Sequence, residues 1–270
     1  MLFAACVDQM SMNFYWWHQF KRATSLVWGI LLGLALSLAA CGSEPVTLPV
    51  LETESTVSVE PSVANATSET WVASAKPHVQ RLEAYDQPGG VSLLLPFEVP
   101  NPHQFGGPMV LMVTEGQPGD GWLKVQLPIR PNGQEGWISE QDYAITSTTI
   151  RAEVDLSETS VIVYDGNEVV AETQAVVGSS ATPTPLGTFY VTAKKQNQES
   201  YLGPWALALS GFSEVHETFA GGLPVIAIHG TSKPEQIGQY RSNGCVRIPN
   251  EIVTLLAEKV PLGAPVEIRA

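Results

Sequence analysis

The residues best suited to chemistry lie near the C-terminal end, around one histidine and one cysteine. His229 directly follows the apolar run 225–228, and Cys245 lies 16 positions later within the segment 242–247. A cysteine attacks a carbonyl carbon as a thiolate, and a nearby imidazole can take the thiol proton or stabilise the thiolate. Gly244 leaves the neighbouring backbone N–H groups unobstructed, so that they can point at the oxygen of a tetrahedral intermediate. These residue types favour cysteine-dependent acyl transfer, with an inert buried thiol as the alternative.

The elements that must position these two residues are predicted to be mainly strands. Short apolar runs alternate with turn residues, for example on either side of the turn Asp165–Asn167. One helix is expected near the C-terminus, with Asn250 as its N-cap, apolar residues three and four positions apart, and Pro261 as its stop. A short strand at 266–268 follows it. The pattern predicts a mainly β domain over residues 149–270 with a short C-terminal helix.

A second β-rich unit is predicted upstream, over residues 76–148. Its short apolar runs are separated by glycine and proline turns, which is typical of a small all-β module. The Gly-Trp starts at Trp122 and Trp137 resemble those of SH3-like barrels. We expect both tryptophans to pack as core side chains instead of lining a ligand groove. Because no acid–base constellation is visible in this stretch, we expect it to position the chemistry and not to perform it.

The N-terminal segment has the layout of an export signal. Lys21 and Arg22 precede an uncharged apolar block, and residues 38–41 read Leu-Ala-Ala-Cys. These four residues resemble the lipobox of bacterial lipoproteins. The resemblance implies a signal peptide over residues 1–40 and a lipidated mature N-terminus at Cys41.

The alternative is an uncleaved transmembrane anchor, which the length of the apolar block permits. Both interpretations export the rest of the chain. Residues 41–75 are rich in Ser, Thr, Val, Glu and Pro and are predicted to form a flexible acidic tether. We therefore expect an exported protein, lipid-anchored to a bacterial membrane and facing the cell wall or periplasm.

The composition argues against several other classes of function. The 14 Lys and Arg residues stand against 27 Asp and Glu, which gives a net charge of −13. Nucleic acid is not expected as a partner, because phosphate binding depends on clustered Lys and Arg. The three cysteines are too few and too scattered for a disulfide scaffold or a zinc finger, and the histidines lack metal-ligand spacing. No glycine-rich phosphate loop is visible, so neither a metal nor a cofactor is expected.

Three segments of the sequence and one glycine resemble the signature of the YkuD family of L,D-transpeptidases. The segments are Val225–Gly230, Ser242–Ile248 and the upstream element Thr184–Gly187, which is followed by Phe189; the glycine is Gly238. The similarity spans roughly Ile150 to Ile268. It implies a YkuD-type β-sandwich catalytic domain.

The resemblance also implies the roles of the two central residues. Cys245 would attack the carbonyl of the L-centred third residue of a peptidoglycan stem tetrapeptide and expel the terminal D-Ala. His229 would be the general base and later protonate the leaving amine, with the Gly230 backbone carbonyl orienting its ring. Transfer of the acyl group to a side-chain amine of a neighbouring stem would make a 3→3 cross-link.

Further roles carried over from the family fall on the loop around the nucleophile. The backbone N–H groups of Asn243, Gly244 and Cys245 would form the oxyanion hole. Ser242 would hold the loop or touch substrate, and Arg247 would pair with a stem carboxylate or bond structurally to loop carbonyls. Many family members have His where Asn243 stands, and some have Asn where Arg247 stands. A substrate contact at position 243 is therefore left open.

Two other activities fit the same residues. With water as acceptor the protein would be an L,D-carboxypeptidase, and a non-catalytic peptidoglycan-binding protein would share the fold. Carbapenem-type β-lactams are expected to acylate Cys245. Tyr201, Trp205 and Phe212 precede the catalytic strand where the family often carries a substrate-covering flap, and they either wall the donor site or pack in the core.

Overall fold

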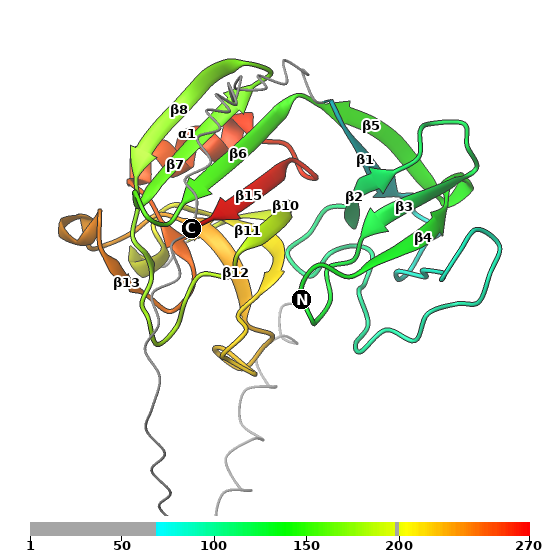
Figure 1. Ribbon diagram of the computed structural model, residues 1–270, viewed down its shortest axis with the longest axis horizontal. Helices are drawn as coiled ribbons and strands as arrows, with labels where there is room; N and C mark the ends of the chain where they lie inside the picture. The colour runs from blue at the N-terminus through cyan, green and yellow to red at the C-terminus, as the bar shows by residue number, and fades with distance from the viewer. Residues whose placement is uncertain (1–68, 198–199) are drawn as a thin grey trace, which may run out of the picture. The chain divides into compact units, whose positions relative to one another are not determined.

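The computed structural model describes residues 69–197 and 200–270, which belong to one compact unit (Figure 1). The predicted signal peptide 1–40, the lipidation site Cys41 and most of the predicted tether lie outside the described residues. Strands dominate the described part, so the fold class is mainly β, as predicted.

The first sheet has five strands in the order β4-β3-β2-β1-β5, with neighbouring strands antiparallel. Its strands are β1 (Thr70–Ala75), β2 (Val110–Glu115), β3 (Trp122–Gln126), β4 (Glu135–Ser139) and β5 (Tyr143–Thr148), with the 3-10 turn η1 (Glu140–Asp142) between the last two. Trp122 and Trp137 are half-buried, and the Trp122 ring meets Tyr85 edge to face at 5.3 Å. The likeness to SH3-like barrels stays a prediction.

Strand β1 corrects the predicted extent of the tether. The tether was expected to continue to residue 75, but Thr70–Ala75 pairs with β2 on one side and β5 on the other. Val72, Ala73 and Ala75 are buried in the core of this sheet. The tether prediction is therefore wrong for these six residues. The three buried side chains of β1 are small and apolar, and they pack into a core that is formed mainly by residues of other strands.

The second sheet has eight strands in the order β14-β12-β11-β10-β15-β6-β7-β8. Its strands are β6 (Ile150–Asp155), β7 (Ser160–Asp165), β8 (Glu168–Gln174), β10 (Gly187–Gln196), β11 (Trp205–Phe212), β12 (Val225–His229), β14 (Val246–Arg247) and β15 (Pro265–Arg269). A separate parallel pair is formed by β9 (Val177–Gly178) and β13 (Tyr240–Ser242). The 3-10 turns η2 (Ser200–Leu202) and η3 (Pro234–Gln236) lie on either side of β12 in the sequence.

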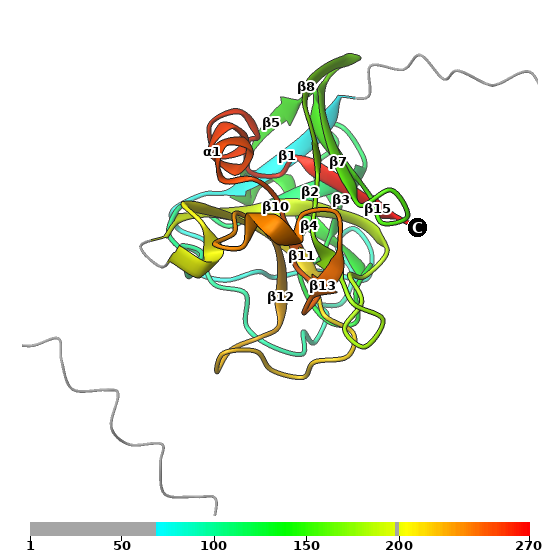
Figure 2. The same cartoon turned by 90° about the vertical axis from the view of Figure 1, so that its left-hand side faces the viewer.

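The helix α1 (Asn250–Lys259) packs against β8, β11 and β12 (Figure 2). Its apolar face buries Val253 and Leu256 in the core of the eight-stranded sheet. The predicted N-cap was off by one residue, because Pro249 occupies the cap position and Asn250 is the first helical residue. The Asn250 side chain bonds elsewhere, as described below.

The two sheets are joined by buried polar contacts. Gln126, at the end of β3, donates its amide nitrogen to Thr188 O at 2.6 Å and accepts from Ser210 Oγ at 3.0 Å. The Asn132 side chain bonds both the N–H and the C=O of Phe212, each at 2.9 Å, as a neighbouring strand would. The first sheet is therefore fixed directly to β10 and β11 of the second.

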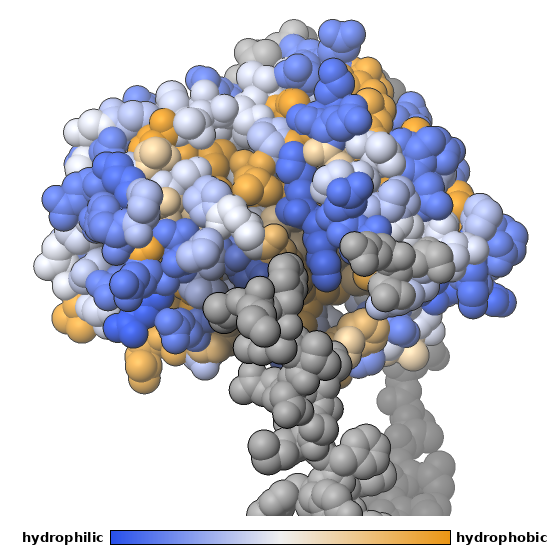
Figure 3. Space-filling model, turned by 180° about the vertical axis from the view of Figure 1, so that it is seen from behind, coloured by the Kyte–Doolittle hydropathy of each residue, from blue (hydrophilic) through white to orange (hydrophobic). Residues whose placement is uncertain are grey.

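The surface of the described residues is mixed. On the face seen in Figure 3, hydrophobic side chains form small patches between hydrophilic ones. No helix within residues 69–197 and 200–270 is both long and apolar enough to cross a membrane.

Candidate active site

His229 is the last residue of β12 and is almost fully buried. Its Nδ1 lies 2.6 Å from the backbone oxygen of Gly230. A carbonyl oxygen can only accept, so Nδ1 carries the proton in this contact and Nε2 is left as the basic nitrogen of the neutral ring. The predicted orientation of His229 by the Gly230 carbonyl is present in the structure.

The surroundings of His229 keep its ring neutral. The pKa of His229 is lowered to about 4, mainly by burial and to a smaller extent by the nearby Arg247 guanidinium. The backbone carbonyls of Gly230 and Leu202 act in the opposite direction, because they stabilise a protonated ring. At neutral pH the imidazole is therefore unprotonated.

Strand pairing brings Cys245 to the same part of the sheet. β12 and β14 run parallel, with His229 opposite Arg247 and Ile228 opposite Val246. Cys245 comes directly before β14, and its Sγ lies nearest to the backbone of β12, towards the start of that strand. The pairing therefore brings the end of the loop that carries Cys245 alongside the strand that ends in His229.

The thiol of Cys245 lies in an apolar setting. Its Sγ is 4.0 Å from Val225 O, and within the described part of the chain it makes no hydrogen bond to His229. Burial raises the pKa of the Cys245 thiol, while a backbone contact to Ala227 and the charge of Arg247 partly offset that rise. The resting site therefore contains a neutral thiol and a neutral imidazole, which favours general-base activation over a preformed ion pair.

The loop before the nucleophile is held by Ser242. This buried residue accepts the Gly244 N–H on its Oγ at 3.1 Å. Its backbone oxygen accepts from Thr182 Oγ1 at 2.9 Å and from the Ser179 N–H at 3.2 Å. These contacts hold the loop, and a contact of Ser242 with substrate stays a prediction. The Gly244 N–H was predicted to form part of the oxyanion hole, but in the structure it donates to Ser242 Oγ. The same role for the N–H groups of Asn243 and Cys245 stays a prediction.

Gly244 is required by the backbone at this loop. Its φ is +112°, a conformation that side-chain-bearing residues rarely adopt. An added Cβ would also approach Ile226 Cδ1 to 3.1 Å. The glycine therefore allows the sharp change of direction that leads into Cys245.

The element Thr184–Gly187 contacts β9, the strand that pairs with β13 just before the Cys245 loop. Thr184 is buried, and its Oγ1 accepts the Gly178 N–H at 2.9 Å. Gly178 has no room for a side chain, because a Cβ would collide with the backbone of 182–184. The supporting contacts of Ser179 and Thr182 were not predicted, although the Thr-Pro element beside them marked the region.

Among the residues that the structure describes, the Arg247 side chain bonds neither a backbone loop carbonyl nor a carboxylate. Its Nη1 donates to Gln236 Oε1 of η3 at 3.4 Å, and its backbone exchanges two hydrogen bonds with Val176. The guanidinium lies near enough to lower the pKa values of both His229 and Cys245. A stem carboxylate as its partner stays a prediction.

The three predicted flap residues separate in the structure. Tyr201 is 62% exposed, and Trp205 is half-buried against the core of the eight-stranded sheet. Phe212 is buried, and its ring centroid lies 5.7 Å from that of Phe97, which is in the segment between β1 and β2. Of the three, Tyr201 is the most exposed, whereas Phe212 packs in the core.

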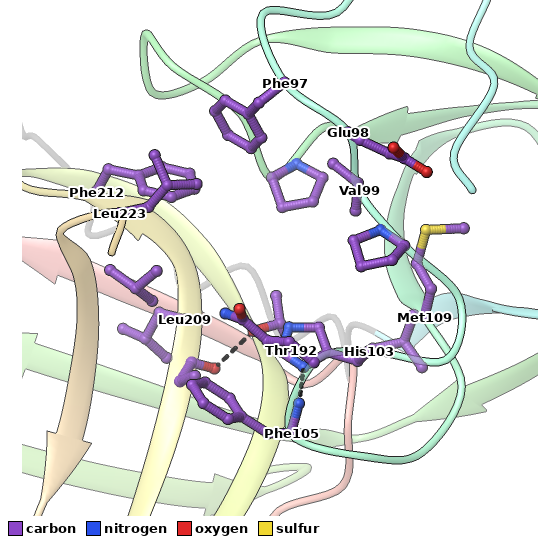
Figure 4. A pocket seen from close by; sticks show the side chains of 16 residues that line it. Phe97, Glu98, Val99, His103, Phe105, Met109, Thr192, Leu209, Phe212 and Leu223 are labelled. Atoms are coloured by element: carbon purple, nitrogen blue, oxygen red, sulfur yellow. Dashed lines mark hydrogen bonds between the residues drawn. The ribbon is translucent and has the colours of Figure 1, made fainter. Parts of the chain in front are cut away.

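A small apolar pocket of about 90 Å³ lies beside β10, β11 and β12. Figure 4 shows Val99 and Met109 on one side of the view and Leu209 and Phe212 on the other, with the Phe105 ring below Leu209. Val225, whose carbonyl faces Cys245 Sγ, also lines it. In the described residues no group of three or more His, Cys, Asp or Glu side chains is placed to hold a metal ion.

Comparison with known proteins agrees with this geometry. Residues 149–268 match the family model described as the L,D-transpeptidase catalytic domain, YkuD, which confirms the predicted resemblance for this part of the chain. A Bacillus subtilis protein provisionally named L,D-transpeptidase YkuD is 35% identical over 102 residues, which cover 38% of this chain and 55% of the relative. Its Bacillus licheniformis counterpart is 32% identical over 118 residues, which cover 44% and 64%. The matches thus span between about half and two thirds of the length of these relatives.

Solved structures give weaker likenesses. A crystal structure of an Enterococcus faecium L,D-transpeptidase mutant aligns with a TM-score of 0.37 and 24% identity, over 44% of this chain and 49% of that one. An L,D-transpeptidase from Mycobacterium smegmatis aligns with a TM-score of 0.37 and 18% identity, over 58% and 70%.

Proposed function

We propose that this protein is a peptidoglycan L,D-transpeptidase that uses Cys245 as its nucleophile. The observation that carries the proposal is the parallel pairing of β12 with β14, because β12 ends in the carbonyl-oriented His229 and β14 begins directly after Cys245. The match of residues 149–268 to the catalytic-domain family supports the choice of substrate class.

The acylation step follows from the atoms of the site. His229 Nε2 takes the proton of the Cys245 thiol while Sγ forms a bond to the carbonyl carbon of the third stem residue. The tetrahedral intermediate collapses by breaking the bond to the D-Ala nitrogen, which receives the proton from Nε2. The products are free D-Ala and a thioester on Cys245.

The second half of the reaction reverses these roles. An amine of a neighbouring stem gives a proton to His229 Nε2 as its nitrogen attacks the thioester carbonyl. The C–S bond breaks, and the proton returns to Sγ. The product is a 3→3 cross-link, and water in place of the amine would yield the L,D-carboxypeptidase product. Carbapenem-type β-lactams are proposed to acylate the same sulfur.

The test is turnover of a purified disaccharide tetrapeptide by the full chain and by Cys245→Ala. We expect the wild type to release D-Ala and form dimers detectable by mass spectrometry, and the variant to lose at least about 10³-fold in rate. The exposed substitution Glu251→Gln serves as a control with wild-type turnover. Undiminished D-Ala release by Cys245→Ala would rule out this nucleophile, and tripeptide without dimer would identify the carboxypeptidase.

We also propose that the protein is exported and anchored by lipid at Cys41, on the strength of the Leu-Ala-Ala-Cys sequence. Globomycin blocks the peptidase that cleaves lipoprotein signals, so treated cells should accumulate a larger precursor. Unchanged gel mobility after treatment would contradict the lipid anchor.

A further inference from the structure

One peptide group connects the catalytic histidine to the start of helix α1. The carbonyl of the Gly230–Thr231 peptide accepts from His229 Nδ1 at 2.6 Å. The N–H of the same peptide donates to Asn250 Oδ1 at 2.8 Å. In a trans peptide the C=O and N–H point in opposite directions, so this group lies between the imidazole and the Asn250 side chain.

Two glycines make the approach of Asn250 possible. A Cβ on Gly203 or on Gly230 would collide with Asn250 Oδ1, and the two glycines also lie against each other. Gly203 has a φ of +67°, which further restricts this position to glycine. The backbone is therefore shaped around the Asn250 oxygen.

The contact fixes the direction of the peptide group. Thr231 is buried, so its N–H would lose its partner if Asn250 Oδ1 were absent. A peptide free to rotate would turn the Gly230 carbonyl away from His229 Nδ1. An acceptor on the N–H also polarises the peptide and makes its carbonyl a better acceptor.

We infer that Asn250 is a positioning residue for His229, acting through the Gly230–Thr231 peptide group. Asn250 holds the peptide, the peptide holds Nδ1–H, and Nε2 is thereby aimed as the base. The role rests on the proposed function only in that His229 is taken to activate Cys245.

The experiment compares Asn250→Ala and Asn250→Asp in the full chain, with Glu251→Gln as the matched control on the same helix turn. The first readout is the rate of Cys245 alkylation by iodoacetamide as a function of pH, which requires no peptidoglycan substrate. We expect Asn250→Ala to lower the rate at neutral pH about tenfold or more, since a misplaced base loses its catalytic advantage.

Asn250→Asp should behave differently. Its carboxylate keeps the acceptor for the Thr231 N–H, so the alkylation rate should stay near that of the wild type. The added negative charge near the ring should raise the pKa of His229 and move the acid limb of the alkylation profile to higher pH. A merely structural role for Asn250 would not produce that shift.

With a disaccharide tetrapeptide as substrate, Asn250→Ala should lower kcat about 10- to 100-fold while KM changes little. Wild-type alkylation profiles in both Asn250 variants would overturn the inference. If the profiles change as expected but the wild type releases no D-Ala, the proposed function fails and the positioning role of Asn250 stands.

Discussion

The polar side chains at the junction of the two sheets and the thiol of Cys245 differ in their hydrogen bonding. Where the five-stranded sheet meets the other, Gln126 and Asn132 each use both an amide donor and an amide acceptor in bonds of 3.0 Å or less. In the eight-stranded sheet, Cys245 Sγ has its backbone contact at 4.0 Å and its charged form is disfavoured. These two side chains at the junction of the sheets are hydrogen-bonded at both ends of their amides, whereas the sulfur proposed to react has only a long backbone contact in the described residues. Substitutions should therefore separate stability from activity.

The largest effect on activity is expected for His229→Gln. Glutamine fills similar space but cannot accept the thiol proton as a base, so kcat should fall about 10² to 10⁴-fold. The free energy of unfolding at neutral pH should change little, because the ring is neutral there. Retention of more than a tenth of the wild-type kcat would contradict general-base catalysis by His229.

The pH dependence of the free energy of unfolding should distinguish His229 from His103, which lies in the segment between β1 and β2. The folded-state pKa of His229 is about 4, against 6.5 when unfolded, so the unfolded state binds more protons between these values. Stability should fall as the pH drops from 6.5 towards 4, by up to about 3 kcal/mol. Burial also lowers the pKa of His103, which adds a loss of the same sign.

Urea unfolding of the wild type, His229→Gln and His103→Gln at several pH values separates the two contributions. The slope of stability against pH should flatten most in His229→Gln. If His103→Gln flattens it more, the catalytic region does not contain the more strongly perturbed histidine.

Much of the candidate site could be predicted from the sequence because its residues are close together in the chain. A strand ending in His229 and a Ser-x-Gly-Cys loop are local patterns, and their pairing follows once the family is recognised. The contacts of Gln126 with Thr188 and Ser210 could not be predicted, because they join residues more than 60 positions apart. No local pattern shows which polar side chain will meet which backbone across two sheets.

The polar junction between the sheets can be tested by Gln126→Ala. The substitution leaves Thr188 O and Ser210 Oγ without this partner, which should lower the free energy of unfolding by about 1–3 kcal/mol. Lys124→Ala, a change on the same strand at a solvent-exposed ion pair, should unfold near wild type. Folded Gln126→Ala should keep its kcat within about twofold, since the residue touches no reacting group; a larger loss in kcat would show that the junction also shapes the active site.

The smallest net effect on kcat is expected for Arg247→Gln, and the change in KM tests whether Arg247 meets a stem carboxylate. Removing the guanidinium should raise the pKa values of His229 and Cys245, because its charge lowers both. A higher thiol pKa makes Cys245 slower to ionise, whereas a higher imidazole pKa makes His229 a stronger base, so the two changes oppose each other in kcat.

If Arg247 only bonds Gln236, kcat and KM should both stay within a few-fold of wild type. If Arg247 pairs with a stem carboxylate, KM for the tetrapeptide should rise about tenfold or more. Loss of that ion pair should not change the alkylation of Cys245 by iodoacetamide, because iodoacetamide carries no carboxylate. Comparing the change in KM with the change in the alkylation rate therefore shows whether the guanidinium binds substrate or only contacts Gln236.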